Sequence, residues 1–313
     1  MFEVKRYEPS HEQAWNDFVA RSKNGTFLFD RRFMDYHSDR FADSSLMILR
    51  KGRIYALLPA NRVGDTLHSH QGLTYGGLLT DAKATAEGVM EAFGALNAWL
   101  RNEGVRRVTY KAMPWIYHRL PAEEDLYALT QVCHARLLTR EISSTILLQQ
   151  PLRFTESRKS GLRKALREGL YMEESGDLAA FWQMLDDNLT SRHHTHPVHS
   201  LDELRLLQGR FPQQIHLYLI YNKEKEPVGG TWVFDTGQVV HTQYIASTKE
   251  GKAHGALDLL FDELINRRYR EGIYLDFGKS TEEGGRVLNE HLIFQKEGFG
   301  GRGVCYDTYE WEP

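Results

Sequence analysis

One carboxylate stands alone in an apolar segment near the C-terminal end of the sequence. The segment reads Ile-Tyr-Leu-Asp-Phe-Gly, and in a β-strand three of its apolar residues share one face: Ile273, Leu275 and Phe277. Asp276 then points to the other face. A carboxylate is costly to bury unless it is paired or used, and burial raises its pKa toward a value suited to accepting a proton from an amine. We therefore predict that Asp276 is a catalytic base.

Two further residues complete this predicted acceptor site. Tyr244 lies in a predicted strand before a long helix, and Lys279 follows the segment that carries Asp276. The alternative is structural, because Asp276 can also accept hydrogen bonds from backbone N–H groups or form an ion pair with Lys279 or Lys296. Replacing Asp276 by asparagine separates the two roles, since a base predicts a loss of activity of about 10²-fold or more with an unchanged melting temperature.

A basic helix is predicted over residues 153–168. Its cations recur at i, i+4 and i+8, and they are Lys159, Arg163 and Arg167. The opposite face is predicted to turn three residues inward, namely Leu162, Ala165 and Leu166. Arginine side chains bind phosphate oxygens in pairs, so we predict that Arg163 and Arg167 bind the phosphates of a nucleotide-linked precursor, a lipid carrier or a tRNA. The alternative is a solvated face, partly neutralised by Glu156 and Glu168.

Four histidines fall within residues 191–200, and they are His193, His194, His196 and His199. A zinc site needs ligands that converge on one tetrahedron, and neither a cysteine nor an HExxH helix accompanies these histidines. Pro197 also favours an extended backbone at His196. We therefore predict no metal and place His196 and His199 on a loop that faces the substrate. A purely structural loop and a zinc site are the alternatives.

Two glycine-containing segments are predicted to contact a substrate. In the first, Gly251 and Gly255 lie in a loop before a long amphipathic helix, so the first amide N–H groups of that helix face outward and suit an anion. Lys252 and Gly255 are the predicted contacts. In the second, Gly76 adjoins Tyr75 in an apolar setting, where glycine indicates a bulge or a close approach of the backbone.

The elements that position these residues follow one order twice. Each half is predicted to contain a strand, two helices, three antiparallel strands, a long helix and a further strand, then a helix and a last strand. The long helix of each half ends at a glycine before a strand, at Gly104 and at Gly272. We predict a duplicated domain, with one copy over residues 1–150 and the other over 151–313. The end of the chain is predicted to return and complete a sheet.

The composition excludes several classes of protein. With 41% hydrophobic and 26% charged residues the chain is an ordinary globular one, and its net charge of −3 means that any anion site must be local. Cys133 and Cys305 lie far apart without a CxxC pattern, which is typical of a reducing compartment. The N-terminal segment lacks the pattern of a signal peptide, and no apolar run reaches the roughly 18 residues of a membrane span. We expect a cytoplasmic protein without a membrane span.

Together these features resemble the GNAT acyltransferase fold, and the tandem arrangement is similar to that of the Fem-type peptidyltransferases. The resemblance covers most of the chain and is carried by NGTFLFDRRFMDYHSDRF, SRKSGLRKALREGL, YIASTKEGKAHGALDLLFDELI, and YLDFGKS with the later FQKEGFGGR. It implies an α+β fold of two tandem GNAT-like domains, each a mixed, mainly antiparallel sheet flanked by helices. It also implies a substrate contact from Tyr36, in the first of these stretches.

The resemblance further implies an acyltransferase. Fem-type enzymes take an aminoacyl group from tRNA and pass it to a peptidoglycan precursor. For this chain that implies transfer of an acyl or aminoacyl group to an amine of a cell-envelope or polysaccharide precursor that carries phosphate groups, with tRNA as a partner. The alternatives are a GNAT-like protein that binds ligands without catalysis, and an ordinary N-acetyltransferase that uses acetyl-CoA.

The donor is either an acyl-CoA or an aminoacyl-tRNA. GNAT domains that use CoA carry Gln/Arg-x-x-Gly-x-Gly/Ala before the long helix, because successive bare amides there hold the pyrophosphate. In this chain Lys252 and Gly255 fall in place, but Leu257 stands where the last small residue is needed. We therefore expect acetyl-CoA to bind weakly or not at all.

Overall fold

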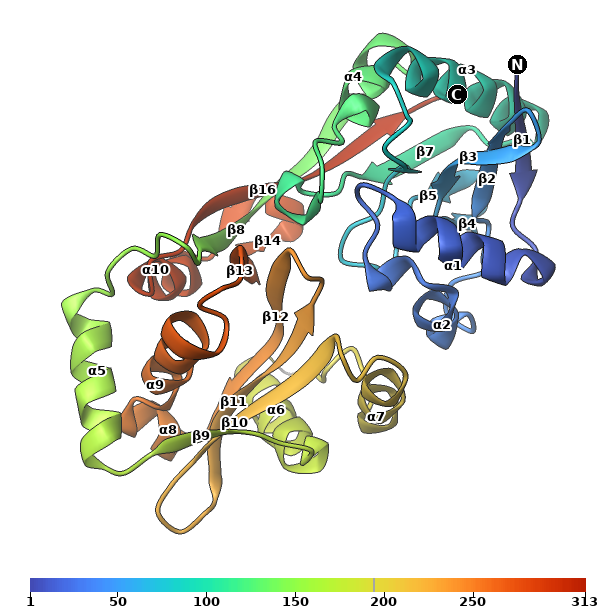
Figure 1. Ribbon diagram of the computed structural model, residues 1–313. Coiled ribbons are helices and arrows are strands. Elements are labelled where there is room, and N and C mark those ends of the chain that lie inside the picture. Colours follow the sequence, from blue (N-terminus) through green and yellow to red (C-terminus); the bar gives the residue numbers. More distant parts are fainter. Residues whose placement is uncertain (194) are drawn as a thin grey trace. The chain divides into compact units, whose positions relative to one another are not determined.

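The computed structural model describes residues 1–193 and 195–313 and divides into two compact units (Figure 1). The first unit consists of Met1–Ile142, Thr281–Val287 and Cys305–Pro313. The second consists of Ser143–Ser280 and Leu288–Val304. Each unit therefore draws on residues from both halves of the sequence. The separation into domains at residue 150 stays a prediction.

The first unit contains two larger groups of strands, besides the short pair β14 (Thr281–Glu282) and β15 (Val287–Leu288), which ends in the second unit. The smaller group is an antiparallel sheet in the order β1-β2-β3-β6, with β1 (Phe2–Arg6), β2 (Leu46–Arg50), β3 (Arg53–Leu58) and β6 (Leu79–Thr80). The other has the order β4-β5-β7-β16-β8, with β4 (Asn61–Val63), β5 (Thr66–His68), β7 (Arg107–Lys111), β16 (Arg302–Trp311) and β8 (Arg136–Leu147). β16 pairs antiparallel with β7, so the end of the chain completes a sheet, which confirms that prediction.

The helices of the first unit are α1 (Glu12–Arg21), α2 (Arg31–Met34), α3 (Ala86–Asn102) and α4 (Glu124–Gln131). Thr85 is the N-cap residue of α3, and its hydroxyl accepts a hydrogen bond from the backbone N–H of Gly88 at 3.2 Å. The apolar face of α3 packs into a core that also holds Trp311 from the last strand. The Trp311 indole N–H donates to Asn97 Oδ1 at 2.9 Å, so this core depends on the end of the chain.

The second unit is built on a mixed sheet in the order β8-β13-β12-β11-β10-β9. Its strands are the end of β8, β9 (Tyr171–Glu174), β10 (Ile215–Tyr221), β11 (Pro227–Asp235), β12 (Val239–Ser247) and β13 (Tyr274–Lys279). β10, β11 and β12 form an antiparallel meander, whereas β12 and β13 run parallel. A parallel pair needs a crossover, and the helices between β12 and β13 supply it.

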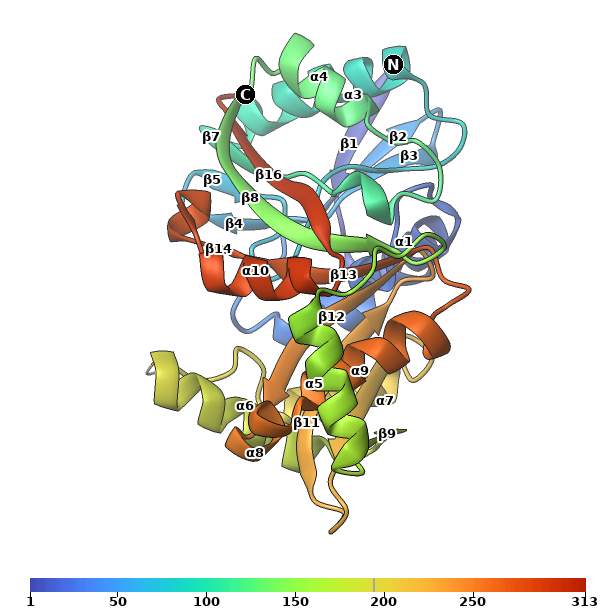
Figure 2. The same cartoon turned by 90° about the vertical axis from the view of Figure 1, so that its left-hand side faces the viewer.

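The helices of the second unit are α5 (Glu156–Arg167), α6 (Leu178–His193), α7 (Leu201–Arg210), α8 (Lys249–His254), α9 (Ala256–Glu263) and α10 (Glu290–Gly298). α9 packs on one face of the sheet with α5 beside it, and α6 packs against β11 and β12 (Figure 2). The core under α9 is apolar, and its aromatic members are Phe261, Phe277 and Phe299. These three rings lie within 6.0 Å of one another, centroid to centroid, and they fix α9, β13 and the end of α10 together.

The segment before the long helix differs from the sequence prediction. The predicted loop is the helix α8, with Thr248 as its N-cap residue and Gly255 as its C-cap residue. The Thr248 hydroxyl accepts from the N–H of Gly251 at 3.0 Å, and the N–H of Lys252 donates to the carbonyl of Thr248 at 3.0 Å. Amides that the prediction left bare for a phosphate are therefore used inside a helix.

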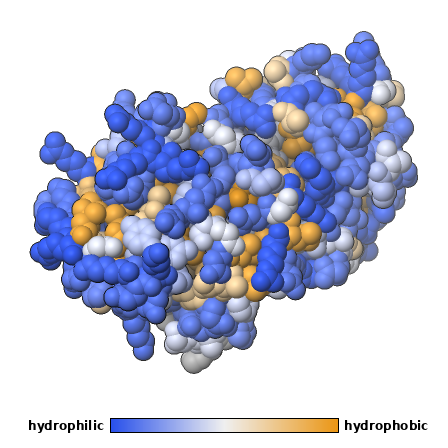
Figure 3. All heavy atoms as spheres, turned by 60° about the horizontal axis from the view of Figure 1, so that its bottom comes forward, coloured by the Kyte–Doolittle hydropathy of each residue, from blue (hydrophilic) through white to orange (hydrophobic). Residues whose placement is uncertain are grey.

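Hydrophilic side chains cover most of the surface seen in Figure 3, with apolar side chains gathered in patches between them. One of the exposed apolar residues is Phe294 of α10, with 68% of its surface exposed. Within the described parts of the chain, no helix combines the length and the apolar character needed to cross a bilayer. The cytoplasmic location stays a prediction.

Candidate active site

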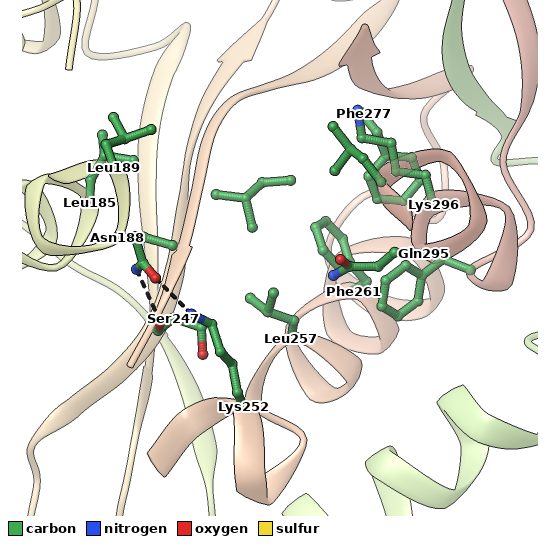
Figure 4. A pocket seen from close by; sticks show the side chains of 14 residues that line it. Leu185, Asn188, Leu189, Ser247, Lys252, Leu257, Phe261, Phe277, Gln295 and Lys296 are labelled. Carbon is green, nitrogen blue, oxygen red and sulfur yellow. Dashed lines mark hydrogen bonds between the residues drawn. The ribbon is translucent and has the colours of Figure 1, made fainter. Parts of the chain in front are cut away.

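A pocket of about 430 Å³ opens in the second unit beside β12 (Figure 4). Side chains from α6, β12, α8, α9, β13 and α10 line it. Most are apolar, and they include Leu185, Leu189, Ile245, Leu257, Phe261, Phe277, Leu292 and Phe299. The charged side chains among the described lining residues are Lys252 and Lys296, so the pocket is apolar with a positive charge toward each end. Such a lining suits an uncharged acyl chain next to a group that is or becomes negative.

The pocket exists because β12 and β13 separate. Their described pairing covers residues 239–241 and 274–276 only. The pocket then lies against the end of β12, at Ile245, Ala246 and Ser247. β12 also has a β-bulge, since Trp232 and Val233 of β11 face Tyr244 and Thr242 and leave Gln243 as an extra residue. A bulge bends its strand, which re-aims the end of β12 away from β13.

Lys296 is the buried cation of the pocket wall. Only 5% of its surface is exposed, and its ammonium donates to the carbonyl oxygens of Gly278 at 2.8 Å and Lys279 at 3.0 Å. An ammonium has three N–H groups, so one remains for a ligand in the pocket. Burial lowers the pKa of Lys296 to about 8, and the negative charge of Asp276 opposes that change. The side chain is therefore charged at neutral pH and loses its proton under mildly basic conditions.

The sequence prediction considered Lys296 only as a partner for Asp276. The signal that identifies it is its spacing, because Lys296 falls at i+4 from Leu292 and i−3 from Phe299, both of which line the pocket. A lysine on the apolar face of a helix breaks the amphipathic pattern. A lysine at such a position either has a partner that compensates its charge or takes part in the function of the protein.

Lys252 occupies the other end of the pocket. Its ammonium donates to Asn188 Oδ1 at 2.7 Å, and the Asn188 amide in turn donates to the carbonyl of Ser247 at 3.0 Å (Figure 4). Asn188 thus joins α6, α8 and the end of β12 through one side chain. The structure places Lys252 at the pocket, while its role as a substrate contact stays a prediction.

Asp276 lies beside the pocket, fully buried, in a polar network. Its carboxylate accepts hydrogen bonds from the hydroxyls of Ser143 at 2.5 Å and Thr145 at 2.7 Å, and its other oxygen lies 2.9 Å from His241 Nδ1. Burial alone would raise the pKa of Asp276, but the hydrogen bonds and the nearby His241 outweigh burial and lower it. The predicted rise of this pKa is therefore wrong, because three partners on β8 and β12 stabilise the charged form.

The two residues predicted to help Asp276 lie in different surroundings. The Tyr244 hydroxyl is 2.6 Å from His199 Nδ1, and burial raises the pKa of Tyr244 to about 12. The side chain of Lys279 is exposed, while its backbone carbonyl accepts from Lys296. The structure thus brings His199 and Tyr244 together and connects Lys279 to the site through its backbone. Their catalytic and binding roles stay predictions.

The predicted basic stripe is exposed on α5. Arg163 and Arg167 point to solvent, and Lys159 lies 2.7 Å from Glu156. Ala165 is buried as predicted, but Leu166 is 56% exposed, so the prediction that it turns inward is wrong. The reason is that α5 contacts α9 along a narrow line, which covers Ala165 but not the next residue.

Gly255 packs against α5. Its φ is +77°, and a β-carbon there would lie 2.3 Å from the carbonyl oxygen of Gly161. Glycine at this position thus permits the crossing of α5 and α9. Close by, Arg158 Nη1 lies 3.0 Å from Asp258 Oδ1 and joins the same two helices. Gly255 does not line the pocket, and its role as a substrate contact stays a prediction.

We expect Gly255→Ala to lower the free energy of unfolding by about 3 kcal/mol or more, because the left-handed conformation costs about 1–2 kcal/mol and the clash adds to it. Gly237→Ala is the matched control, since Gly237 has a φ of +83° but open space around its α-carbon. The control should cost only about 1–2 kcal/mol. Urea unfolding of both variants measures the difference, and equal losses would contradict the packing role.

Three predicted substrate contacts lie in the first unit. Tyr36 stacks on His37 with ring centroids 4.2 Å apart, and the hydroxyl of the buried Tyr75 is 3.1 Å from Thr26 Oγ1. A β-carbon at Gly76 would lie 1.6 Å from the carbonyl oxygen of Ser69, so the predicted close approach of backbone is present there. None of the three lines the pocket of the second unit, and their substrate contacts stay predictions.

The histidine segment is only partly described. His194 lies outside the described residues, and the side chain of His193 is not described. His196 Nδ1 is 2.7 Å from Asp186 Oδ1 on the exposed side of α6, while the buried His199 bonds to Tyr244. Where side chains are described, no three His, Cys, Asp or Glu residues are grouped to hold a metal ion.

Residues 155–284 match the family model described as an acetyltransferase (GNAT) domain. Almost all of this range lies in the second unit, which is thus a GNAT domain. No curated protein sequence matches the chain. The pocket of the GNAT domain therefore lies in a domain type that transfers acyl groups, and the chain is an acyltransferase.

Solved structures show how far the fold extends. FemX has a TM-score of 0.68 at 11% identity, covering 99% of this chain and 97% of that chain. L-PGS from Bacillus licheniformis has a TM-score of 0.63 at 13% identity, covering 97% and 92%. A tandem GNAT protein from the clavulanic acid biosynthesis pathway has a TM-score of 0.50 at 12% identity, covering 100% and 98%. The predicted fold of two tandem GNAT-like domains, similar to that of Fem-type proteins, is confirmed.

Proposed function

We propose that the GNAT domain transfers an acyl or aminoacyl group to an amine of a cell-envelope or polysaccharide precursor. The observation that carries this proposal is the Lys296 ammonium, which is buried at the wall of an apolar pocket with one N–H group unused. An acyl carbonyl bound in the pocket with its oxygen near Lys296 would be polarised before any reaction takes place.

In the proposed reaction the acceptor amine attacks the carbonyl carbon of the donor. A C–N bond forms, the bond between the carbonyl carbon and the donor oxygen breaks, and the departing oxygen takes the proton that the amine loses. Negative charge collects on the carbonyl oxygen in the transition state, where the fixed Lys296 ammonium binds it more strongly than in the ground state. The pocket contributes by holding the two reactants in line.

We propose aminoacyl-tRNA as the donor. Two observations support this choice: α8 uses the amides that a pyrophosphate would need, and α5 presents exposed arginines next to α9. The fold shared with FemX and the resemblance to Fem-type enzymes support it as well. The phosphate groups of the acceptor precursor would bind locally, because the chain as a whole carries a small negative charge.

The arginine stripe makes a testable contribution to donor binding. Replacing Arg163 and Arg167 together by glutamine should weaken the binding of aminoacyl-tRNA about tenfold and reduce its salt dependence by about two phosphate contacts. Filter binding at several salt concentrations measures both quantities. Glutamine at Arg267 and Arg270, two exposed arginines of the same unit, is the matched control and should leave both unchanged. Equal losses in the two double variants would mean that α5 is only a solvated face.

The donor can be decided directly. The wild-type protein is incubated with radiolabelled aminoacyl-tRNA or acetyl-CoA and with an amine-bearing, phosphate-containing envelope precursor, and product is detected by mass spectrometry. Transfer from aminoacyl-tRNA, together with no low-micromolar calorimetric binding of acetyl-CoA, is the expected result. Tight binding of acetyl-CoA with acetylated product would replace this proposal by an ordinary N-acetyltransferase. Product from neither donor, with either ligand still bound, would favour a binding protein.

A further inference from the structure

We propose that Asp276 is a positioning residue which, held by His241, fixes the Gly278 peptide and through it the charged Lys296 ammonium at the pocket wall. This inference rests on the proposed function for its catalytic meaning, although the linkage itself is a property of the folded protein alone. It assigns Asp276 a task different from that of a base that contacts the substrate.

The linkage is a short chain of hydrogen bonds. His241 Nδ1 lies 2.9 Å from Asp276 Oδ2, and the same oxygen accepts from the backbone N–H of Gly278 at 3.3 Å. The carbonyl of Gly278 then accepts from Lys296 Nζ at 2.8 Å. The backbone N–H and C=O of Gly278 thus connect the buried carboxylate of Asp276 to the buried ammonium of Lys296.

The backbone at Gly278 is shaped for this task. Its φ is +75°, and the register between β13 and β8 shifts between Asp276 and Lys279. Glycine adopts this conformation without strain, whereas other residues rarely do. A β-carbon at Gly278 would also lie 3.3 Å from Cε1 of His241. The irregularity turns the carbonyls of Gly278 and Lys279 toward α10, where Lys296 binds both.

The electrostatics agree with the geometry. Burial disfavours the charged form of Lys296, and the negative charge of Asp276 opposes that effect. The other titratable groups on the two strands beside it are His241 and Tyr244 on β12, and Tyr274 and the exposed Lys279 on β13. Asp276 itself is fully buried and does not line the pocket, so it acts on a ligand through Lys296.

The test follows the titration of Lys296 itself and needs no substrate. Protein labelled with ¹³C at lysine Cε is titrated by NMR, and the Lys296 signal is assigned from the Lys296→Gln variant. In the wild type the midpoint should lie at about 8. In Asp276→Asn, which removes the negative charge, the midpoint should fall by roughly one pH unit or more, a tenfold change in proton affinity. Asp258→Asn, which alters another buried carboxylate of the same unit, should leave it unchanged.

A second readout uses the wild-type protein only, in case Asp276→Asn fails to fold. The backbone amide signal of Gly278 should move with a midpoint equal to that of Lys296, because the peptide connects both charged groups. The linkage is overturned if the Gly278 signal does not change as Lys296 titrates. It is also overturned if the Asp276→Asn variant folds and the midpoint of Lys296 is unchanged. Both readouts remain decisive if no acyl transfer is ever observed, so a failure of the proposed function is recognised separately.

Discussion

We expect that replacing Lys296 by glutamine lowers the rate of acyl transfer about 10²- to 10³-fold and leaves the fold intact. The reason is electrostatic, because a fixed ammonium in an apolar pocket stabilises the developing oxyanion far more than an amide does. Glutamine keeps N–H donors but lacks the positive charge, so the loss should appear mainly in kcat. Steady-state kinetics with saturating donor measures this loss.

Lys225→Gln is the matched control for this variant. Lys225 is an exposed lysine of the same unit, in the turn between β10 and β11, and it does not line the pocket. Its replacement should leave kcat and KM within a factor of about two, as is usual for surface substitutions. If both variants keep full activity, Lys296 is not part of the catalytic machinery and the proposed function loses its main support.

The Lys296 variant should also differ in the pH dependence of stability. The pKa of Lys296 is about 8 in the folded protein against an ordinary value of 10.5, so between these values the unfolded chain binds more protons than the folded one. The free energy of unfolding of the wild type should therefore rise with pH across this window, by about 1–3 kcal/mol relative to Lys296→Gln. Urea unfolding at pH 7, 8, 9 and 10 measures the difference. A constant difference would mean that Lys296 titrates normally.

Asp276→Asn is expected to destabilise the protein by about 2–4 kcal/mol, because it breaks a buried network in which one carboxylate serves several donors. The asparagine amide would place its NH₂ group where the carboxylate accepted hydrogen bonds, either from Ser143 and Thr145 or from His241. The melting temperature should therefore fall clearly. This expectation differs from the sequence-based one, in which a catalytic base left the melting temperature unchanged.

Thermal unfolding followed by circular dichroism distinguishes these outcomes. Asp262→Asn is the matched control, because Asp262 accepts an exposed hydrogen bond from the Asn266 amide and its replacement should cost no more than about 0.5 kcal/mol. If Asp276→Asn melts like the control while activity falls about 10²-fold, the role of catalytic base is supported and the positioning role is not.

The sequence was sufficient for the parts of the fold that depend on local pattern. The end of the long helix α3 at Gly104 and the strand that carries Asp276 are present as predicted. The burial of Asp276 also followed from the apolar residues of that strand. Its pKa did not, because the residues that stabilise its charge lie on β8 and β12, more than 30 positions away in the sequence. Pairing of this kind is set by the sheet order, which one sequence does not contain.

The candidate site was predicted less well than the fold. Gly255 has the spacing of a phosphate-binding loop, yet its missing side chain is needed where α9 crosses α5. Tyr244 and His199 were both identified, but not as partners, because His199 lies in the loop between α6 and α7 and Tyr244 in β12. Lys296 was considered only as a partner of Asp276, because a lysine in a helix is usually solvated and only tertiary packing shows that this one is buried.

The interleaving of the two units has a consequence for biosynthesis. Lys296 and α10 belong to the second unit, and Trp311 with most of β16 belongs to the first, so each unit needs residues that are made after residue 287. Domains of many proteins fold one after the other as they leave the ribosome. Here a nascent chain that ends before residue 288 lacks the wall of the pocket and the last strand of the first core. Neither unit can therefore complete its fold until these residues have been made, and until then both units keep unfinished apolar surfaces.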